Sequence, residues 1–293
     1  MVVKLAELNM KKILVTGSNG QLGSELRLLS EKEKNFNFEF VDRSVLDLSS
    51  EKSIKNFFSK SKDYFAIINA AAYTAVDLAE KDEKNAELVN VNGAKILAGY
   101  AKTLGAKFIH VSTDFVFDGT HFRPYTETAV KNPISIYGKT KSAGEDQVLE
   151  ENPDSIIIRT SWVYSKFGKN FFNTIAKLAK ERENLRVIDD QIGTPTWAGD
   201  LARVCFLATS TTKSGIYHFS NEGVASWFDF AYEIVSSLGY PCKVIPIATE
   251  DYPTDAKRPP YSVLSKQKFR ENFEFENVHW KQRLQELVRE IIQ

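Results

Sequence analysis

A tyrosine and a lysine, Tyr137 and Lys141, lie four positions apart in the segment SIYGKTKSAGE. Residues at that spacing share one face of a helix, so a phenol and an ammonium group can meet there. An ammonium beside a phenol favours the phenolate and lowers a pKa that starts near about 10, toward the range in which tyrosine exchanges protons. Such pairs also occur by chance on helix surfaces, so the chemistry depends on the surroundings of this pair.

The composition favours a small-molecule partner. The chain has 293 residues, enough for one large domain or two smaller ones, and two are favoured. Lys+Arg and Asp+Glu both number 38, which leaves no surplus charge to attract nucleic acid or an acidic membrane surface. No apolar run approaches the roughly 20 residues of a membrane span. The first ten residues show no signal-peptide core, and we expect them to be an extension without an assigned function.

The two cysteines, Cys205 and Cys242, are far apart and belong to no CxxC motif. Their positions suggest neither a disulfide framework nor a structural zinc site. We therefore expect a protein of the reducing cytoplasm.

Strands and helices alternate along the first half of the chain. The segments 64–73, 107–114 and 155–164 are each expected to be a strand, and 85–105 one long helix. Such alternation predicts an α/β fold, a Rossmann-type doubly wound parallel sheet with a smaller C-terminal substrate-binding lobe. We expect the Rossmann domain to comprise 11–161 and about 197–220, and the lobe about 162–196 and 221–293.

A glycine-rich turn follows the first strand. In GSNGQLG, residues Gly17, Gly20 and Gly23 stand between strand and helix, the context in which glycines let the backbone approach a dinucleotide pyrophosphate. An ordinary tight turn is the alternative. Asp42 follows near the expected spacing of about 20 residues and favours NAD, because it can accept a hydrogen bond from a ribose hydroxyl. Arg43 can pair with the 2′-phosphate of NADP or face solvent, so the sequence leaves NADH and NADPH both open.

Further candidate residues follow other strands of the predicted sheet. Parallel strands bring their carboxyl ends to one edge, where open α/β sheets bind ligands. A threonine hydroxyl on that edge can bind a carbonyl oxygen that also faces Tyr137. The segments on this edge are Asp47 with Leu48, Ala71 to Thr74 and Ser112 to Asp114.

The dinucleotide turn, the threonine hydroxyl and the Tyr-x-x-x-Lys helix together resemble the extended short-chain dehydrogenase/reductase family. Within it, the chain is most similar to the dTDP-4-dehydrorhamnose reductases, from about Lys11 to the C-terminus. The segments that carry the similarity are GSNGQLGSEL, NAAAYTAVDLAE, STDFVFDG, YGKTKSAGE, RTSWVY, DQIGTPTWAGDLA and RPPYSVL.

The resemblance implies that a reduced nicotinamide gives hydride to C4 of a 4-keto sugar nucleotide, while Tyr137 donates a proton. Thr113 would bind the developing alkoxide and Lys141 would hold the nicotinamide ribose. Candidate cofactor contacts, from the motif and the resemblance, are Gly17, Gly20, Gln21, Leu22, Gly23, Asp42, Arg43, Asp47, Leu48, Ala71, Ala72, Tyr73, Thr74, Tyr137 and Lys141. Candidate substrate contacts are Thr113, Asp114, Tyr137, Trp162 and Arg258. Trp162 can also be a core residue, and Arg258 a solvated one.

Two alternatives to the reductase remain open, an epimerase and a regulatory subunit, while a third, a dehydratase, is disfavoured. Nucleotide-sugar dehydratases of the family carry Asp-Glu after the threonine, and Asp114-Phe115 here argues against dehydration. A nucleotide-sugar 4-epimerase would retain its NAD, and the regulatory subunit of methionine adenosyltransferase resembles the same reductases without catalysis.

Some members hold Mg²⁺ between subunits through a glutamate placed like Glu25, but metal is not predicted, because a glutamate there also suits the helix dipole. The protein is expected to be a monomer or a homodimer.

Overall fold

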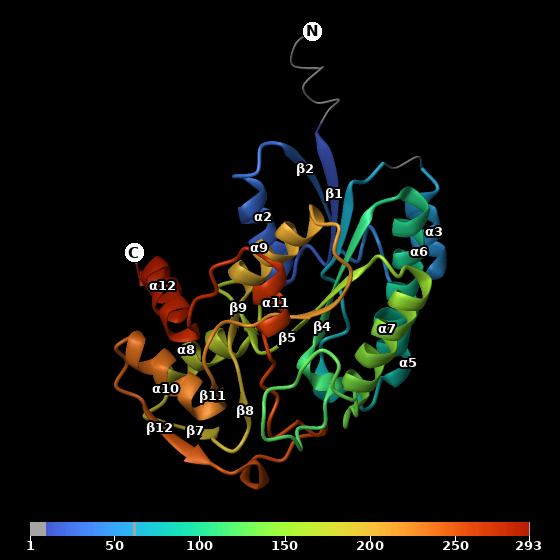
Figure 1. The fold of residues 1–293 in the computed structure, drawn as a ribbon. Coiled ribbons are helices and arrows are strands. Elements are labelled where there is room, and N and C mark those ends of the chain that lie inside the picture. The colour runs from blue at the N-terminus through green and yellow to red at the C-terminus, as the bar shows by residue number, and fades with distance from the viewer. Residues whose placement is uncertain (1–9, 61–62, 293) are drawn as a thin grey trace.

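The computed structural model of the chain describes residues 10–60 and 63–292. The expectation for the N-terminal extension falls on residues 1–9 and lies outside these ranges. Six parallel strands form the main sheet in the order β10-β5-β4-β3-β1-β2 (Figure 1). This order confirms the predicted doubly wound α/β fold, because the chain leaves β1 toward one edge and crosses back at β3 toward the other. The strands are β1 (Lys11–Thr16), β2 (Phe36–Val41), β3 (Ala66–Asn69), β4 (Lys107–Thr113), β5 (Ile156–Thr160) and β10 (Gly215–His218).

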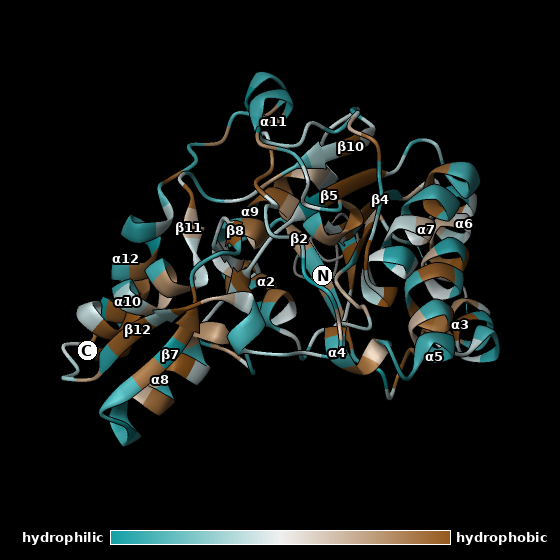
Figure 2. Cartoon of the chain, turned by 90° about the horizontal axis from the view of Figure 1, so that it is seen from below, coloured by the Kyte–Doolittle hydropathy of each residue, from teal (hydrophilic) through white to brown (hydrophobic). Residues whose placement is uncertain are grey.

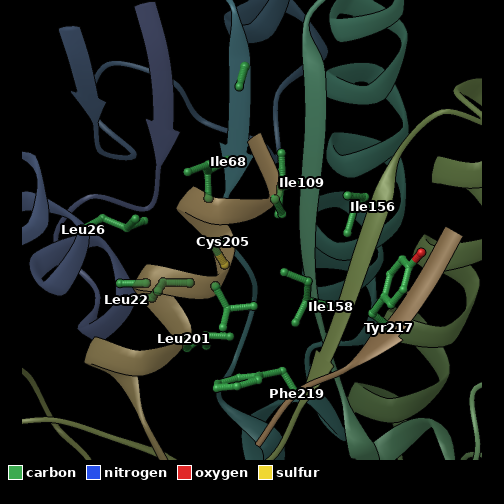
Figure 3. Packing of buried hydrophobic residues seen from close by; sticks show 14 of the residues in the cluster. Leu22, Leu26, Ile68, Ile109, Ile156, Ile158, Leu201, Cys205, Tyr217 and Phe219 are labelled. Carbon is green, nitrogen blue, oxygen red and sulfur yellow. The ribbon is translucent and has the colours of Figure 1, made fainter. Parts of the chain in front are cut away.

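Helices cover both faces of the sheet, because consecutive residues of its strands point to opposite sides. Ile13 and Val15 of β1 pack against α2 (Gln21–Ser30) and α9 (Ala198–Thr209), the face shown in Figure 3. Leu14 packs in a second buried cluster on the other face. That cluster includes residues of α3 (Glu51–Phe58), α6 (Ala94–Leu104) and α7 (Ile136–Glu151).

The C-terminal lobe, which we define as the elements packed around Phe172, Phe230 and Trp280, has its own buried core. In Figure 1 it lies beside the main sheet. Three two-stranded sheets accompany it, β6 with β9, β8 with β11 and β7 with β12. The domain boundaries themselves stay a prediction. The elements are α8 (Phe171–Glu181), α10 (Trp227–Ser237), α12 (Trp280–Ile292), β6 (Val163–Tyr164), β7 (Asn184–Ile188), β8 (Ile192–Gly193), β9 (Thr196–Trp197), β11 (Ala225–Ser226) and β12 (Lys243–Ile247).

Short helices complete the described chain. They are α4 (Val76–Ala79), α5 (Glu83–Glu87), a π-helical turn (Leu88–Gly93), α11 (Gln267–Asn272) and two 3₁₀ turns (Asp114–Val116 and Thr249–Asp251). Figure 2 shows apolar strands at the centre of the sheet and hydrophilic residues on the flanking helices. In the part of the chain that the structure describes, no helix is both long and apolar enough to cross a membrane.

The expected long helix over 85–105 is confirmed as one continuous helical run, in which a π-helical turn lies between α5 and α6. The turn lies close to other backbone, since a Cβ added at Gly93 would stand 2.5 Å from the Leu48 carbonyl oxygen. The expectation of one strand over 155–164 is wrong, because β5 ends at Thr160 and Trp162 adopts a left-handed φ of 47°.

Candidate active site

The glycine-rich turn joins β1 to α2 at the point where the strand order reverses. Gly17 has a φ of 65°, and a Cβ there would lie 2.8 Å from Ala70 and Ala71 after β3. Gly20 is the N-cap of α2 and offers no side chain, so the first N–H groups of the helix stay free for a ligand. Gly23 packs beneath the turn, where a Cβ would lie 2.5 Å from the Gly17 carbonyl oxygen. This cradle of close backbone and free N–H groups fits a dinucleotide pyrophosphate.

A cavity of about 950 Å³ opens at the carboxyl ends of the strands and extends to the lobe. All the candidate residues except Gly23 line it. They are Gly17, Gly20, Gln21, Leu22, Asp42, Arg43, Asp47, Leu48, Ala71, Ala72, Tyr73, Thr74, Thr113, Asp114, Tyr137, Lys141, Trp162 and Arg258. The structure therefore brings the candidate cofactor and substrate residues to one space.

Asp42 and Arg43 lie at the end of the cavity beyond the turn. One Asp42 oxygen accepts a hydrogen bond from Asn19 Nδ2 at 2.9 Å, and the other accepts from Ser44 N and Oγ at 2.9 and 2.6 Å. The bonds from Ser44, then that from Asn19, lower the pKa of Asp42. The Arg43 side chain is 78% exposed, and its Nε lies 3.3 Å from Asp47 Oδ2. A carboxylate and a guanidinium are thus both available where the ribose of a bound dinucleotide would lie.

Helix α7 carries the Tyr-x-x-x-Lys pair and packs tightly on neighbouring backbone. Its N-cap Ser135 accepts a hydrogen bond from Gly138 N at 3.2 Å. A Cβ at Gly138 would stand 2.3 Å from the Phe115 carbonyl oxygen, and one at Gly144 would stand 2.1 Å from that of Asn90. These two glycines let α7 approach closely enough to place Tyr137 beside the end of β4.

The Tyr137 phenol stays protonated. Burial raises its pKa to about 12; a hydrogen bond with Thr113 lowers it less, and the charge of Asp114 raises it further. The sequence-based expectation of a lowered tyrosine pKa is therefore wrong for this structure. The protonated phenol is nevertheless the form that a proton donor needs.

Lys141 is almost completely buried, with 1% of its surface exposed. Burial lowers its pKa to about 8, and the charge of Glu145 partly opposes that shift. Its Nζ donates a hydrogen bond to the Val111 carbonyl oxygen at 2.7 Å and lies 3.3 Å from His110 Nε2. The amino group is thus held against β4.

Thr113 and Asp114 end β4 beside Tyr137. Thr113 Oγ1 donates a hydrogen bond to Asp114 Oδ1 at 3.0 Å and accepts one from Phe115 N at 3.2 Å. Burial raises the pKa of Asp114 to about 6, against smaller opposing hydrogen bonds, the largest from Ser262. The Phe115 ring contacts the Tyr137 ring edge to face, with centroids 5.5 Å apart. A packing contact therefore occupies the position where the dehydratases carry their second carboxylate.

Trp162 forms part of the cavity wall with Trp227, which the sequence analysis missed. Their rings stack at 3.6 Å and 6°, and Trp227 Nε1 donates a hydrogen bond to Gln191 Oε1 at 3.2 Å. A Cβ at Gly193 would stand 2.6 Å from the Trp162 ring. The Trp162 ring is held in one orientation by its left-handed backbone, by the stack with Trp227 and by the missing side chain at Gly193. No local motif marks Trp227, because it reaches the wall from α10.

Arg258 lines the cavity from the segment between β12 and α11 and is not simply solvated. It forms two hydrogen bonds with the Asp77 carboxylate, at 3.0 and 2.7 Å, and a third with Thr254 Oγ1 at 2.8 Å. Hydrogen bonding to Arg258 lowers the pKa of Asp77 against the effect of burial. The loop around Arg258 is thereby tied to α4, which follows the central strand β3.

The family comparison agrees with this geometry. A family model described as RmlD substrate binding domain matches residues 10–292. The chain belongs to this family. Membership confirms the resemblance to the dTDP-4-dehydrorhamnose reductases that the motifs indicated.

Several relatives in this family are similar over almost the whole chain. A dTDP-4-dehydrorhamnose reductase of Aggregatibacter actinomycetemcomitans is 40% identical over 290 residues, 95% of this chain and 98% of the relative. A dTDP-4-keto-6-deoxy-D-glucose reductase of Streptomyces niveus is 38% identical over 260 residues, 88% and 90% of the two chains. The crystal structure of dTDP-4-dehydrorhamnose reductase from Bacillus anthracis str. Ames in complex with NADP has a TM-score of 0.92 and 37% identity, and covers 96% of this chain and 99% of that one.

The π-helical turn supplies a second residue that the sequence analysis missed. Asn90 Oδ1 accepts a hydrogen bond from Tyr73 N at 2.8 Å, and its Nδ2 donates to Tyr73 O at 3.2 Å and to Thr140 Oγ1 at 3.1 Å. Asn90 therefore ties the loop of Ala72 to Thr74 to the helix of Tyr137. A π turn inside a helix often marks a functional site, but a single sequence does not reveal the turn.

Within residues 10–60 and 63–292, no group of three or more His, Cys, Asp and Glu side chains could hold an ion. Glu25, for which magnesium was considered, is 5% exposed, and burial raises its pKa to about 7 against the charge of Lys166.

Proposed function

We propose that this chain reduces the C4 keto group of dTDP-4-dehydro-L-rhamnose to give dTDP-L-rhamnose, with NADPH or NADH as reductant. The observation that carries the proposal is the meeting of Tyr137, Thr113 and Lys141 in the same cavity as the glycine-rich turn. Names of relatives in the family support the sugar nucleotide.

The residues present fit a nicotinamide dinucleotide. The turn of Gly17 to Leu22 would hold the pyrophosphate, Asp42 or Arg43 the adenosine ribose, and Lys141 the nicotinamide ribose. When bound, the reduced cofactor supplies a hydride to C4 of the keto sugar.

The protein side chains supply the proton and hold the sugar. Tyr137, whose phenol carries its proton throughout the neutral range, donates it to O4 as negative charge develops there. Thr113 hydrogen-bonds the same oxygen, and Asp114 in its ionised form accepts from a sugar hydroxyl. The Trp162 ring forms a flat wall that orients the substrate, and Arg258 exchanges its contact with Asp77 for the substrate diphosphate.

The decisive experiment follows oxidation of NADPH and of NADH with dTDP-4-dehydro-L-rhamnose generated in situ. Tyr137→Phe removes the proton donor, so we expect turnover to fall by about 100- to 10,000-fold with nucleotide affinity nearly unchanged. Tyr232→Phe is the matched control, because Tyr232 is 58% exposed in the lobe and is not among the cavity-lining residues. A Tyr137→Phe variant as active as the parent would show that Tyr137 is not the acid.

The same assay separates the rival functions. A parent protein that reduces dTDP-4-keto-6-deoxy-D-glucose faster would resemble the Streptomyces niveus relative in its substrate. NAD that stays bound through purification, with no net oxidation, would indicate a 4-epimerase. Nucleotide binding without hydride transfer to either sugar would indicate a regulatory partner of the methionine adenosyltransferase type.

We also infer a cytoplasmic protein that works as a monomer or homodimer. The buried, unpaired Cys205 and Cys242 suit a reducing compartment. Light scattering of the purified protein measures the oligomeric state directly.

A further inference from the structure

A line of buried polar side chains lies behind Lys141 and crosses three neighbouring strands. Thr16 Oγ1 at the end of β1 donates to Asn69 Oδ1 of β3 at 2.7 Å, and Asn69 Nδ2 lies 3.0 Å from His110 Nδ1 of β4. His110 Nε2 then lies 3.3 Å from Lys141 Nζ. Each of these four residues is only 1% exposed. The reductase mechanism uses Lys141 and none of the other three.

The direction of these hydrogen bonds depends on the charge of Lys141. With Thr16 donating to the Asn69 oxygen, the Asn69 amide donates to His110 Nδ1, so the one proton of the neutral imidazole sits on Nε2. Nε2–H then donates to Lys141 Nζ, and only a neutral amine has the lone pair to accept it.

The opposite direction suits the ammonium form. When Lys141 carries its proton, the ammonium donates to His110 Nε2, and the neutral imidazole is then the tautomer with its proton on Nδ1. Between the two states the pair takes up one proton from solvent. Nδ1–H then needs an acceptor, and a rotated Asn69 amide offers its oxygen while its NH₂ faces Thr16 Oγ1. His110 remains neutral in both states, because burial and then the charge of Lys141 hold its pKa well below its usual range. The line of side chains can therefore satisfy Lys141 with or without its proton.

We propose that His110 is a positioning residue that holds the Lys141 amino group in place in both protonation states, with Asn69 and Thr16 rearranging to match. This inference rests on the proposed function, in which Lys141 holds the nicotinamide ribose. The other groups that face Lys141 do not replace His110. The Val111 carbonyl can only accept, and Glu145, one turn further along α7, is engaged by Arg159 and Ser112.

Two substitutions at His110 separate the two ring nitrogens. The longer side chain of His110→Gln places an amide near the position of Nε2. That amide can donate or accept a hydrogen bond, so Lys141 keeps a partner. His110→Asn places its amide near Nδ1, keeps the contact with Asn69 and abandons Lys141. Because each variant keeps one of two buried contacts, similar losses of thermal stability are expected.

The activities should differ where the stabilities do not. We expect kcat to fall by about 100-fold in His110→Asn, as for a misplaced catalytic group, while His110→Gln keeps most of its turnover. The alkaline limb of the kcat–pH profile should move in His110→Asn and stay in place in His110→Gln. Equal losses of kcat in the two variants, or losses that follow the unfolding midpoints, overturn the inference.

A control and a second measurement keep the two proposals distinct. His218 is also buried, with its Nδ1 near the Tyr125 carbonyl and its Nε2 near Arg159. His218→Gln and His218→Asn should therefore both destabilise the protein, and their kcat values should be similar to each other.

If the parent protein reduces neither sugar, the proposed function fails, and the affinity of each His110 variant for NADPH is measured instead by fluorescence titration. His110→Asn should then bind NADPH about tenfold more weakly than His110→Gln. Equal affinities overturn the inference.

Discussion

A buried ion pair fixes helix α7 on the sheet, and its loss should be costly. Arg159 Nε and Nη2 of β5 contact the Glu145 carboxylate of α7 at 2.8 and 2.7 Å, and Ser112 Oγ donates to the same carboxylate at 2.6 Å. Glu145 is fully buried and Arg159 is 1% exposed. Glu145→Gln keeps the side-chain shape but removes the charge, which leaves the guanidinium buried without a fully charged partner nearby.

The expected magnitude follows from what remains around Arg159. Its other acceptors are the neutral His218 Nε2 at 3.3 Å and the Glu127 carbonyl oxygen at 3.4 Å, and neither compensates a charge. Removing one partner of a buried pair costs about 3 to 5 kcal/mol of unfolding free energy. That is a large part of the roughly 5 to 15 kcal/mol by which domains are stable.

Urea unfolding at pH 7, followed by circular dichroism, measures the loss. Glu51→Gln is the matched control, because the pair of Glu51 and Lys55 at 2.5 Å is about 60% exposed on α3 and should contribute less than about 1 kcal/mol. A loss in Glu145→Gln as small as that in the control would refute the reasoning that burial, rather than distance, makes this pair important.

Three further predictions concern the cavity. Trp227→Leu removes the stacking partner of Trp162, so KM for the sugar nucleotide should rise by about tenfold, while a fluorescence titration shows unchanged NADPH affinity. Asp42→Ala should weaken NADH more than NADPH, because it removes the ribose acceptor and leaves Arg43; equal losses of both would show that Asp42 does not contact the ribose. With its pKa near 6, Asp114 loses its charge as the pH falls through that value, so kcat/KM should fall on the acidic side, and Asp114→Asn should remove that limb of the profile.

The sheet could be predicted from sequence because its causes are local. The consecutive buried apolar residues of β1 and the glycine-rich turn before α2 are visible in a few neighbouring letters. The π-helical turn could not be predicted, because it depends on the distant Gly144 and Leu48 approaching its backbone. The end of β5 was missed for a similar reason, since the left-handed Trp162 is favoured by a stack with Trp227 and by space at Gly193.

The candidate site shows the same division. Residues that belong to compact motifs were brought together in the cavity, whereas Trp227 lines it from the distant α10. Asn90 does not line the cavity but holds the backbone of Tyr73, which does. His110 belongs to the segment IHVSTD, but the sequence does not show that its two ring nitrogens lie beside Asn69 and Lys141.

The Tyr137–Lys141 pair shows why spacing alone gave the wrong electrostatics. The spacing of four residues correctly places both side chains on one face of α7, but it does not say which acceptor the ammonium selects. Lys141 contacts the Val111 carbonyl and His110, and the buried phenol keeps its proton. A reductase needs that proton on the tyrosine when hydride reaches C4, and an enzyme working in the oxidative direction would need it removed. Burial of the phenol therefore keeps Tyr137 in the protonated form that the proposed reduction needs at O4.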